Sequence, residues 1–146
     1  MNLKLETRVK MDFLSVKSGF DRHLFEQLNP PFPRVKLLRF DGSRTGDVVS
    51  LHLDFLFFKQ KWTSLISEDR TDESEFFFVD QGKELPFFLK EWKHTHRVIQ
   101  RDQQSLIVDD IQFKTPFIWM DYLLYPLMWM QFAARKPVYQ RLFGKA

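Results

Sequence analysis

A tryptophan, two histidines and an aspartate have the spacing needed to face one another across a β-hairpin. Trp92, His94 and His96 follow the two-residue period of a strand. A second strand-like stretch contains Asp109 and ends before Pro116. Histidine changes its charge close to neutral pH, and a carboxylate beside it fixes its tautomer. These four side chains can therefore orient a small molecule, transfer a proton or hold a metal ion.

The register of this hairpin follows from the position of its turn. A turn at Asp102-Gln103 gives cross-strand pairs of His96 with Asp109, His94 with Ile111, and Trp92 with Phe113. A slip of one residue would bring Lys93 and Arg97 inside, so the more apolar face must be the inner one. We therefore predict that residues 92 to 113 form a hairpin, with Trp92, His94, His96 and Asp109 all pointing into the interior.

Several chemical roles fit this group. The two histidines can be interior polar residues that Asp109, tyrosine hydroxyls or water satisfy, or they can orient a ligand. His-x-His with an aspartate also suits zinc or iron, but the sequence offers no fourth ligand. His96 held by Asp109, with His94 beside it, has the geometry of an acid/base pair but lacks a nucleophile. We predict the polar end of a binding cavity, with no metal and no cofactor.

The rest of the chain alternates between strand and helix patterns. A first strand spans Leu3 to Phe13, and one or two short helices follow between Ser15 and Leu28, with a break at Gly19 to Asp21. A run of further strands comes next. These strands are predicted at Val35 to Phe40, Asp47 to Phe58, Lys61 to Glu68, Glu75 to Asp80, Lys90 to Gln100, and Ser105 to Lys114.

One long apolar helix is predicted at the end of the chain. Thr115 can cap it, Pro116 suits its first position, and nearly every residue from 117 to 134 is apolar. A membrane span is the alternative for such a stretch. We favour a core helix, because the strands must bury a face and no other segment is long enough to cover it. The segment from Arg135 to Lys145 is predicted to be a solvated basic end.

Composition narrows the class of protein. The 146 residues suit one domain, 1–146, and include 17 phenylalanines and no cysteine. We predict that most of the phenylalanines, and the helix with Trp119 and Trp129, belong to the core. Three consecutive phenylalanines lie on both faces of a sheet, so some must be exposed or covered by a partner or by the loop from Gly82 to Phe88. The net charge of +3 lies in the last 31 residues, which argues against a nucleic-acid binder.

The start, Met1 to Glu6, alternates polar and apolar residues without a signal-peptide pattern, so we expect a cytoplasmic protein.

The motifs also resemble a known family. Phe78-Val79-Asp80-Gln81, Pro86-Phe87, Trp92-Lys93-His94-Thr95-His96 and Asp109-Asp110-Ile111-Gln112-Phe113 resemble an uncharacterised bacterial branch of the SRPBCC, or START-like, superfamily. This resemblance implies an α+β helix-grip fold, in which a seven-stranded antiparallel sheet wraps around a long C-terminal helix and encloses a cavity. Relatives bind lipids, sterols or polyketides, and some are polyketide cyclases. Leu85 and the turn at 101–104 depart from the glycines that the family often has there.

We therefore predict that the chain binds a small hydrophobic ligand between the sheet and the helix. The predicted ligand-binding residues are Trp92, His94, His96, Asp109, Ile111, Phe113, Phe78, Met120, Leu124 and Met128. Two alternatives are a cyclase or dehydratase that uses a His-Asp pair, and a membrane-surface or protein-interaction module that uses the basic C-terminus. The expected partner is a small hydrophobic molecule, without nucleic acid and without stable membrane insertion.

Overall fold

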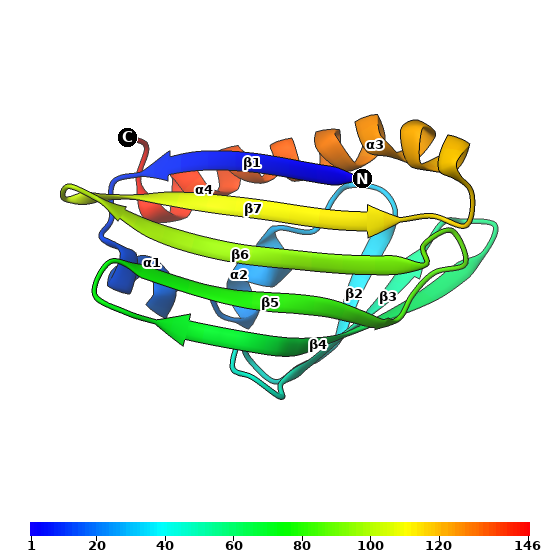
Figure 1. Cartoon of the computed structure of the whole chain (residues 1–146), viewed down its shortest axis with the longest axis horizontal. Helices are drawn as coiled ribbons and strands as arrows, with labels where there is room; N and C mark the ends of the chain where they lie inside the picture. The colour runs from blue at the N-terminus through cyan, green and yellow to red at the C-terminus, as the bar shows by residue number, and fades with distance from the viewer.

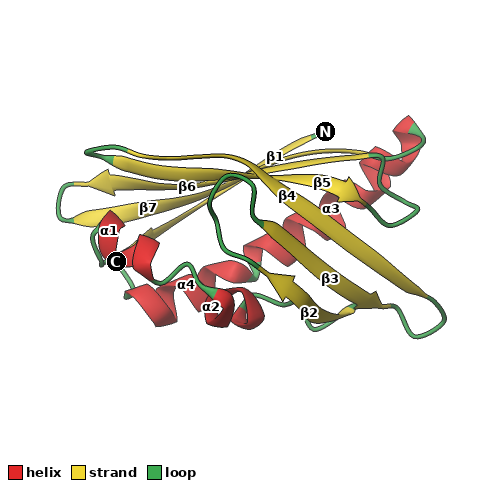
Figure 2. Ribbon diagram, turned by 90° about the horizontal axis from the view of Figure 1, so that it is seen from below, coloured by secondary structure: helices red, strands yellow, loops and turns green.

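The computed structural model describes all residues from 1 to 146 and contains one curled antiparallel sheet. Its seven strands lie in the order β1-β7-β6-β5-β4-β3-β2 (Figure 1). Their bounds are β1 (Asn2–Val9), β2 (Arg34–Phe40), β3 (Val48–Asp54), β4 (Lys59–Thr71), β5 (Glu75–Glu84), β6 (Glu91–Arg101) and β7 (Gln104–Lys114). The helices are α1 (Phe13–Ser18), α2 (Arg22–Gln27), α3 (Ile118–Ala133) and α4 (Arg135–Phe143). Figure 2 shows α3 and α4 running one after the other across the sheet. The predicted helix-grip fold is confirmed.

The register predicted for the hairpin of β6 and β7 is confirmed. Trp92 is paired with Phe113, His94 with Ile111, and His96 with Asp109. Along β6, buried positions alternate with more exposed ones from Trp92 to Val98. The strand period of two and the tight turn fix this arrangement together, because either one alone would allow a slip.

The C-terminal segment differs from the prediction of a solvated basic end. It forms α4, whose Tyr139 and Phe143 are buried in the larger of the two core clusters. Tyr139 stacks on Phe20, with ring centroids 6.3 Å apart. Pro137 does not end the structure because it lies in the first turn of α4, where its missing N–H is not needed. Lys136 and Arg141 are exposed on this packed helix, whereas the Arg135 side chain is largely buried.

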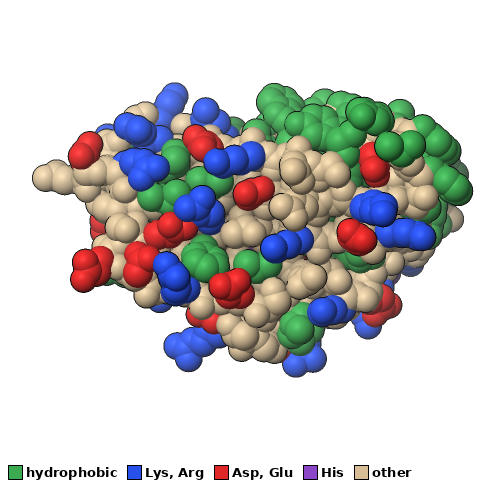
Figure 3. All heavy atoms as spheres, in the orientation of Figure 1, with side chains coloured by type: hydrophobic (Ala, Val, Ile, Leu, Met, Phe, Trp, Pro, Cys, Tyr) green, Lys and Arg blue, Asp and Glu red, His purple; other side chains and the backbone are tan.

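The predicted core role of the long helix is wrong for most of its surface. Only Asp121, Met128 and Phe132 of α3 are buried, whereas Trp119 is 62% exposed and Trp129 is 47% exposed. The helix packs against β1 and β7 at one edge of the sheet. The side of α3 that faces these strands is covered, and its opposite side is exposed to solvent. Figure 3 shows the exposed apolar side chains gathered over α3. No helix of the structure has the length and apolar character needed to span a membrane.

The start of α3 is fixed by an aspartate rather than by the predicted Thr115 cap. The helix begins at Ile118, and Phe117 precedes it without a side-chain cap. Asp121 Oδ1 accepts hydrogen bonds from the Thr115 backbone N–H and from its hydroxyl, each at 2.7 Å. Thr115 therefore ties the end of β7 to the first turn of α3.

We expect Asp121→Ala to lower the free energy of unfolding by about 1–3 kcal/mol, because it leaves the buried backbone N–H of Thr115 unpaired. Urea denaturation measures this loss. Glu91→Ala, at an exposed position with no side-chain hydrogen bond, is the matched control and should change stability little. Equal stability of the two variants would contradict the anchoring role of Asp121.

Candidate functional site

A cavity of about 600 Å³ lies between the inner face of the sheet, α3, and the loop that follows α2. It is lined by 32 residues, of which 21 are hydrophobic. Strands β2 to β6 supply one wall, and Leu124, Met128 and Phe132 of α3 supply another. Because α3 leans on β1 and β7, it leaves the opposite half of the curled sheet uncovered. The cavity occupies this space.

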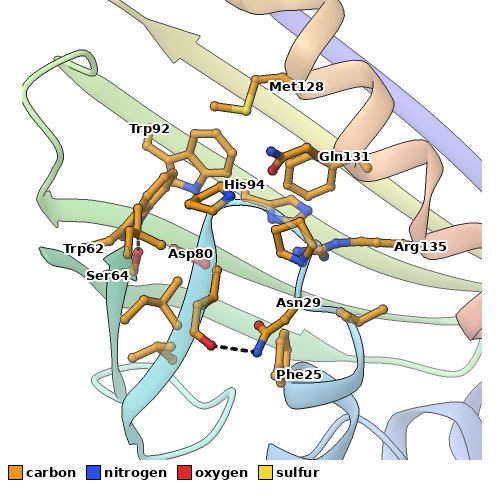
Figure 4. Close-up of a pocket in the computed structure, with 18 of the residues that line it drawn as sticks. Phe25, Asn29, Trp62, Ser64, Asp80, Trp92, His94, Met128, Gln131 and Arg135 are labelled. Carbon is orange, nitrogen blue, oxygen red and sulfur yellow. Dashed lines mark hydrogen bonds between the residues drawn. The ribbon is translucent and has the colours of Figure 1, made fainter. Parts of the chain in front are cut away.

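Strand alternation brings the polar lining residues together. His94 and His96 are two residues apart on β6, and Asp80 of β5 is the direct cross-strand partner of His94. Phe78 is the partner of His96, and the two rings stack with centroids 4.3 Å apart. Arg135, the first residue of α4, reaches the same cavity (Figure 4). A small polar group is thus set into an otherwise apolar lining.

A buried carboxylate lies behind this polar group and holds part of it in place. His94 Nε2 is 2.8 Å from Asp109 Oδ1, and both side chains are almost completely buried. The Tyr139 hydroxyl donates to Asp109 Oδ2 at 3.3 Å. Arg135 Nη1 lies 3.6 Å from Asp109 Oδ1. A buried charge is tolerated only when it is paired and hydrogen-bonded, and Asp109 has three such neighbours.

Burial and neighbouring charges set the protonation of the group. Burial raises the pKa of Asp80, which the nearby His94 and Ser64 only partly offset. Burial also acts to raise the pKa of Asp109, but the His94 hydrogen bond and the Arg135 charge outweigh it and lower that pKa. Burial, together with the neighbouring His94 and Arg135, holds the pKa of His96 well below its usual value. His96 is therefore neutral at pH 7, and Asp109 is ionised.

Several buried polar atoms of the group have no hydrogen-bond partner within the protein. They are Asp80 Oδ1, both ring nitrogens of His96, and Arg135 Nη1. A neutral imidazole with a free lone pair can accept a hydrogen bond or a proton inside the cavity. No serine or threonine hydroxyl is hydrogen-bonded to either histidine, so the nucleophile–base pair of covalent catalysis is not formed here.

The structure brings only some of the predicted site residues to the cavity. Its lining includes Trp92, His94, His96, Phe78, Leu124 and Met128. Asp109, Ile111 and Phe113 are buried but lie outside the lining, as does the half-buried Met120. Ile111 and Phe113 instead pack beneath α3 in the smaller core cluster. They point to the same face as the histidines, but β7 lies under the part of the sheet that α3 covers.

The expected His96–Asp109 contact needs a correction. The two residues are cross-strand partners, yet the hydrogen bond of Asp109 goes to His94, and His96 Nδ1 stays 3.8 Å away. Diagonal neighbours on a sheet are within reach of long side chains. Arg135 and Tyr139 also contact Asp109, so its position depends on α4 as well as on the strand register.

The sequence reasoning missed Asp80, Ser64, Trp62, Arg135 and Tyr139. Asp80 continues the alternation of Phe76 and Phe78 on β5, so a stricter use of the two-residue period would have placed it inside. Arg135 and Tyr139 are four residues apart on one side of α4. That spacing was a usable signal, but it has meaning only once the segment is known to be helical.

Comparisons with known proteins support the fold. No protein-family model and no curated protein matches the chain. Among solved structures, a protein from Arthrobacter aurescens aligns with a TM-score of 0.65 and 12% identity, over 95% of this chain and 82% of that one. A norcoclaurine synthase from Thalictrum flavum aligns with a TM-score of 0.61 and 14% identity, over 87% of this chain and 82% of that one. An aromatase/cyclase from Streptomyces sp. R1128 aligns with a TM-score of 0.55 and 19% identity, over 80% of this chain and 70% of that one. The chain therefore shares the helix-grip fold with these solved structures.

We expect Asp109→Asn to destabilise the protein by about 3–5 kcal/mol, because it removes the charge that pairs with the largely buried Arg135. Chemical denaturation measures the change. Asp110→Asn is the matched control, since Asp110 is the next residue along β7 and has no side-chain hydrogen bond. If both variants lost the same small amount, the Asp109 cluster would not be a structural anchor.

Proposed function

We propose that the protein binds an elongated apolar molecule in the cavity, with the polar end of that molecule at Asp80 and His96. The observation that carries the proposal is the lining, which is mostly hydrophobic but contains buried polar atoms without partners. Pockets that take up small molecules typically measure roughly 300–1,000 Å³ and combine an apolar wall with a few polar groups. The volume of about 600 Å³ fits this range.

Different residues of the lining suit different parts of such a ligand. Trp62 and Trp92 contact edge to face, with ring centroids 4.7 Å apart, and present a rigid apolar wall. Leu51 and Leu53 of β3 line the cavity as well. Each buried methylene contributes roughly 0.8 kcal/mol, so an alkyl chain here can offset the entropy lost on association. The free nitrogens of His96 can hydrogen-bond to a hydroxyl or carbonyl oxygen.

A cavity-filling substitution tests this proposal. Leu51→Trp should weaken the binding of decanol by about tenfold or more, because the larger side chain displaces about two methylenes of the ligand. Isothermal titration calorimetry measures the affinity. Leu38→Trp introduces the same side chain at an exposed position on β2, outside the lining, and should bind decanol like the unmodified protein. Equal affinities for all three proteins would contradict binding in the cavity.

The exposed face of α3 favours a second candidate function, which is docking on a lipid surface. The exposed apolar residues of α3 are Ile118, Trp119, Tyr122, Leu123, Leu127, Trp129 and Met130, and Phe117 just before the helix is exposed as well. A patch this extensive is unusual on a protein surface without a partner (Figure 3). Leu127 and Met130 also line the cavity, so the patch continues into the proposed binding site. A hollow beside α3 is lined by Lys90, Lys93 and Lys114 and by the acidic residues Glu91 and Asp121. The lysines outnumber the acidic residues, which suits anionic headgroups.

We expect the double variant Trp119→Ser, Leu123→Ser to lose co-sedimentation with vesicles that contain anionic phospholipid, because two large side chains no longer enter the interface. Phe57→Ser is the control, since Phe57 is 95% exposed but lies outside α3. Equal sedimentation of both variants would contradict docking through α3. Truncation after Ala134 is not a usable test, because it removes the buried Tyr139 and Phe143 from the core.

A further inference from the structure

Three side chains of the cavity lie close enough together to share one ion. Asp80, His94 and His96 each offer one ligand atom, and these atoms all lie within 4.8 Å of one another. They come from two neighbouring strands, with Asp80 directly opposite His94 and His96 two residues further along β6. The backbone of the sheet therefore sets their separation. The third ligand is Asp80. It is not Asp109, which the sequence analysis placed beside the two histidines.

The ligand atoms are buried and mostly unused. Asp80 Oδ1 and both ring nitrogens of His96 have no hydrogen-bond partner in the protein. His94 is 2% exposed and His96 is 3% exposed. Buried polar atoms are rarely left unpaired, and those that remain commonly mark a ligand or ion. The unpaired atoms of Asp80 and His96 can each donate an electron pair to an ion.

His94 is held in the way that metal-binding histidines usually are. Its Nε2 donates to Asp109 Oδ1 at 2.8 Å, and no hydrogen bond of the structure uses its Nδ1. A carboxylate that accepts from one ring nitrogen fixes the tautomer and leaves the lone pair of the other nitrogen for a metal. Asp109 is in turn held by the Tyr139 hydroxyl. The outer contacts of a metal site are thus present as well as the ligands.

The charges around the site admit a cation. Three charged side chains face this region: Asp80 and Asp109 are acidic, and Arg135 is basic. Arg135 is offset by Asp109, whose Oδ1 lies 3.6 Å from its Nη1. A divalent ion would compensate the buried carboxylate of Asp80, whose Oδ1 has no hydrogen-bond partner in the protein. Two imidazole nitrogens and one carboxylate oxygen suit zinc or ferrous iron better than calcium or magnesium, which prefer oxygen ligands.

We propose that Asp80, His94 and His96 bind a divalent transition-metal ion whose remaining coordination positions face the apolar cavity. Three protein ligands leave room for water or for an oxygen atom of a bound molecule. This inference goes beyond the proposed binding function and does not depend on it, because the three ligands are in place without any apolar ligand.

Metal titration of the whole chain tests this site. Protein stripped with a chelator is titrated with Zn²⁺ in competition with a chromophoric indicator, in the absence of any apolar ligand. We expect one Zn²⁺ per chain, and about hundredfold weaker binding in His96→Gln and in Asp80→Asn, which each lose a ligand. His23→Gln, at an exposed histidine on α2, is the control and should bind like the unmodified protein. Asp109→Asn should weaken binding by about tenfold, since it loosens His94 without removing a ligand.

A second measurement keeps the test decisive if a ligand variant fails to fold. Paramagnetic Co²⁺ added to the unmodified protein should broaden the amide resonances of residues 78–82 and 92–98 before those of the turn at 101–104. Absence of saturable Zn²⁺ binding, equal affinity in the His96 and His23 variants, or broadening that is centred elsewhere would each overturn the proposal. None of these results would affect the cavity, whose occupancy is measured with decanol.

Discussion

The arrangement of the whole cavity depends on one buried carboxylate. Asp109 is 3% exposed, and in that environment its charge must be matched by nearby donors. His94 of β6 supplies one, and Arg135 and Tyr139 of α4 supply the others. The same interaction thus orients a histidine of the lining, attaches α4 to the sheet and keeps Arg135 at the cavity. A neutral side chain at this position would weaken the hold on His94 and Arg135, while Tyr139 and Phe143 would still pack α4 into the core.

The position of the C-terminal helices explains why a cavity is left. The second half of the C-terminal segment, α4, packs its aromatic residues with α1 and α2 in the larger core cluster. The first half, α3, leans on β1 and β7 and leaves the inner face of β2 to β6 free. This uncovered apolar face is where the proposed hydrophobic ligand would lie. The unusually apolar surface of α3 is the outer consequence of the same geometry.

The sequence predicted the hairpin well, because a period of two residues and a tight turn determine the register of β6 and β7 completely. The fold followed from the order of the elements and from the motif between residues 78 and 116. The hydrogen-bond partner of Asp109 could not be predicted, since the choice between His94 and His96 depends on α4. The exposed side of α3 was missed for a related reason: a helix that is apolar on all sides gives no indication of which side faces the protein.

Contacts between a bound ligand and individual methyl groups test the central claim most directly. Nuclear Overhauser effects from decanol can be measured on protein with labelled methyl groups in leucine, isoleucine and methionine. The account predicts contacts from the alkyl chain to Leu53 and Met128, which line the cavity. Contacts confined to Ile118 and Leu123 on the exposed side of α3, or no contacts at all, would contradict it.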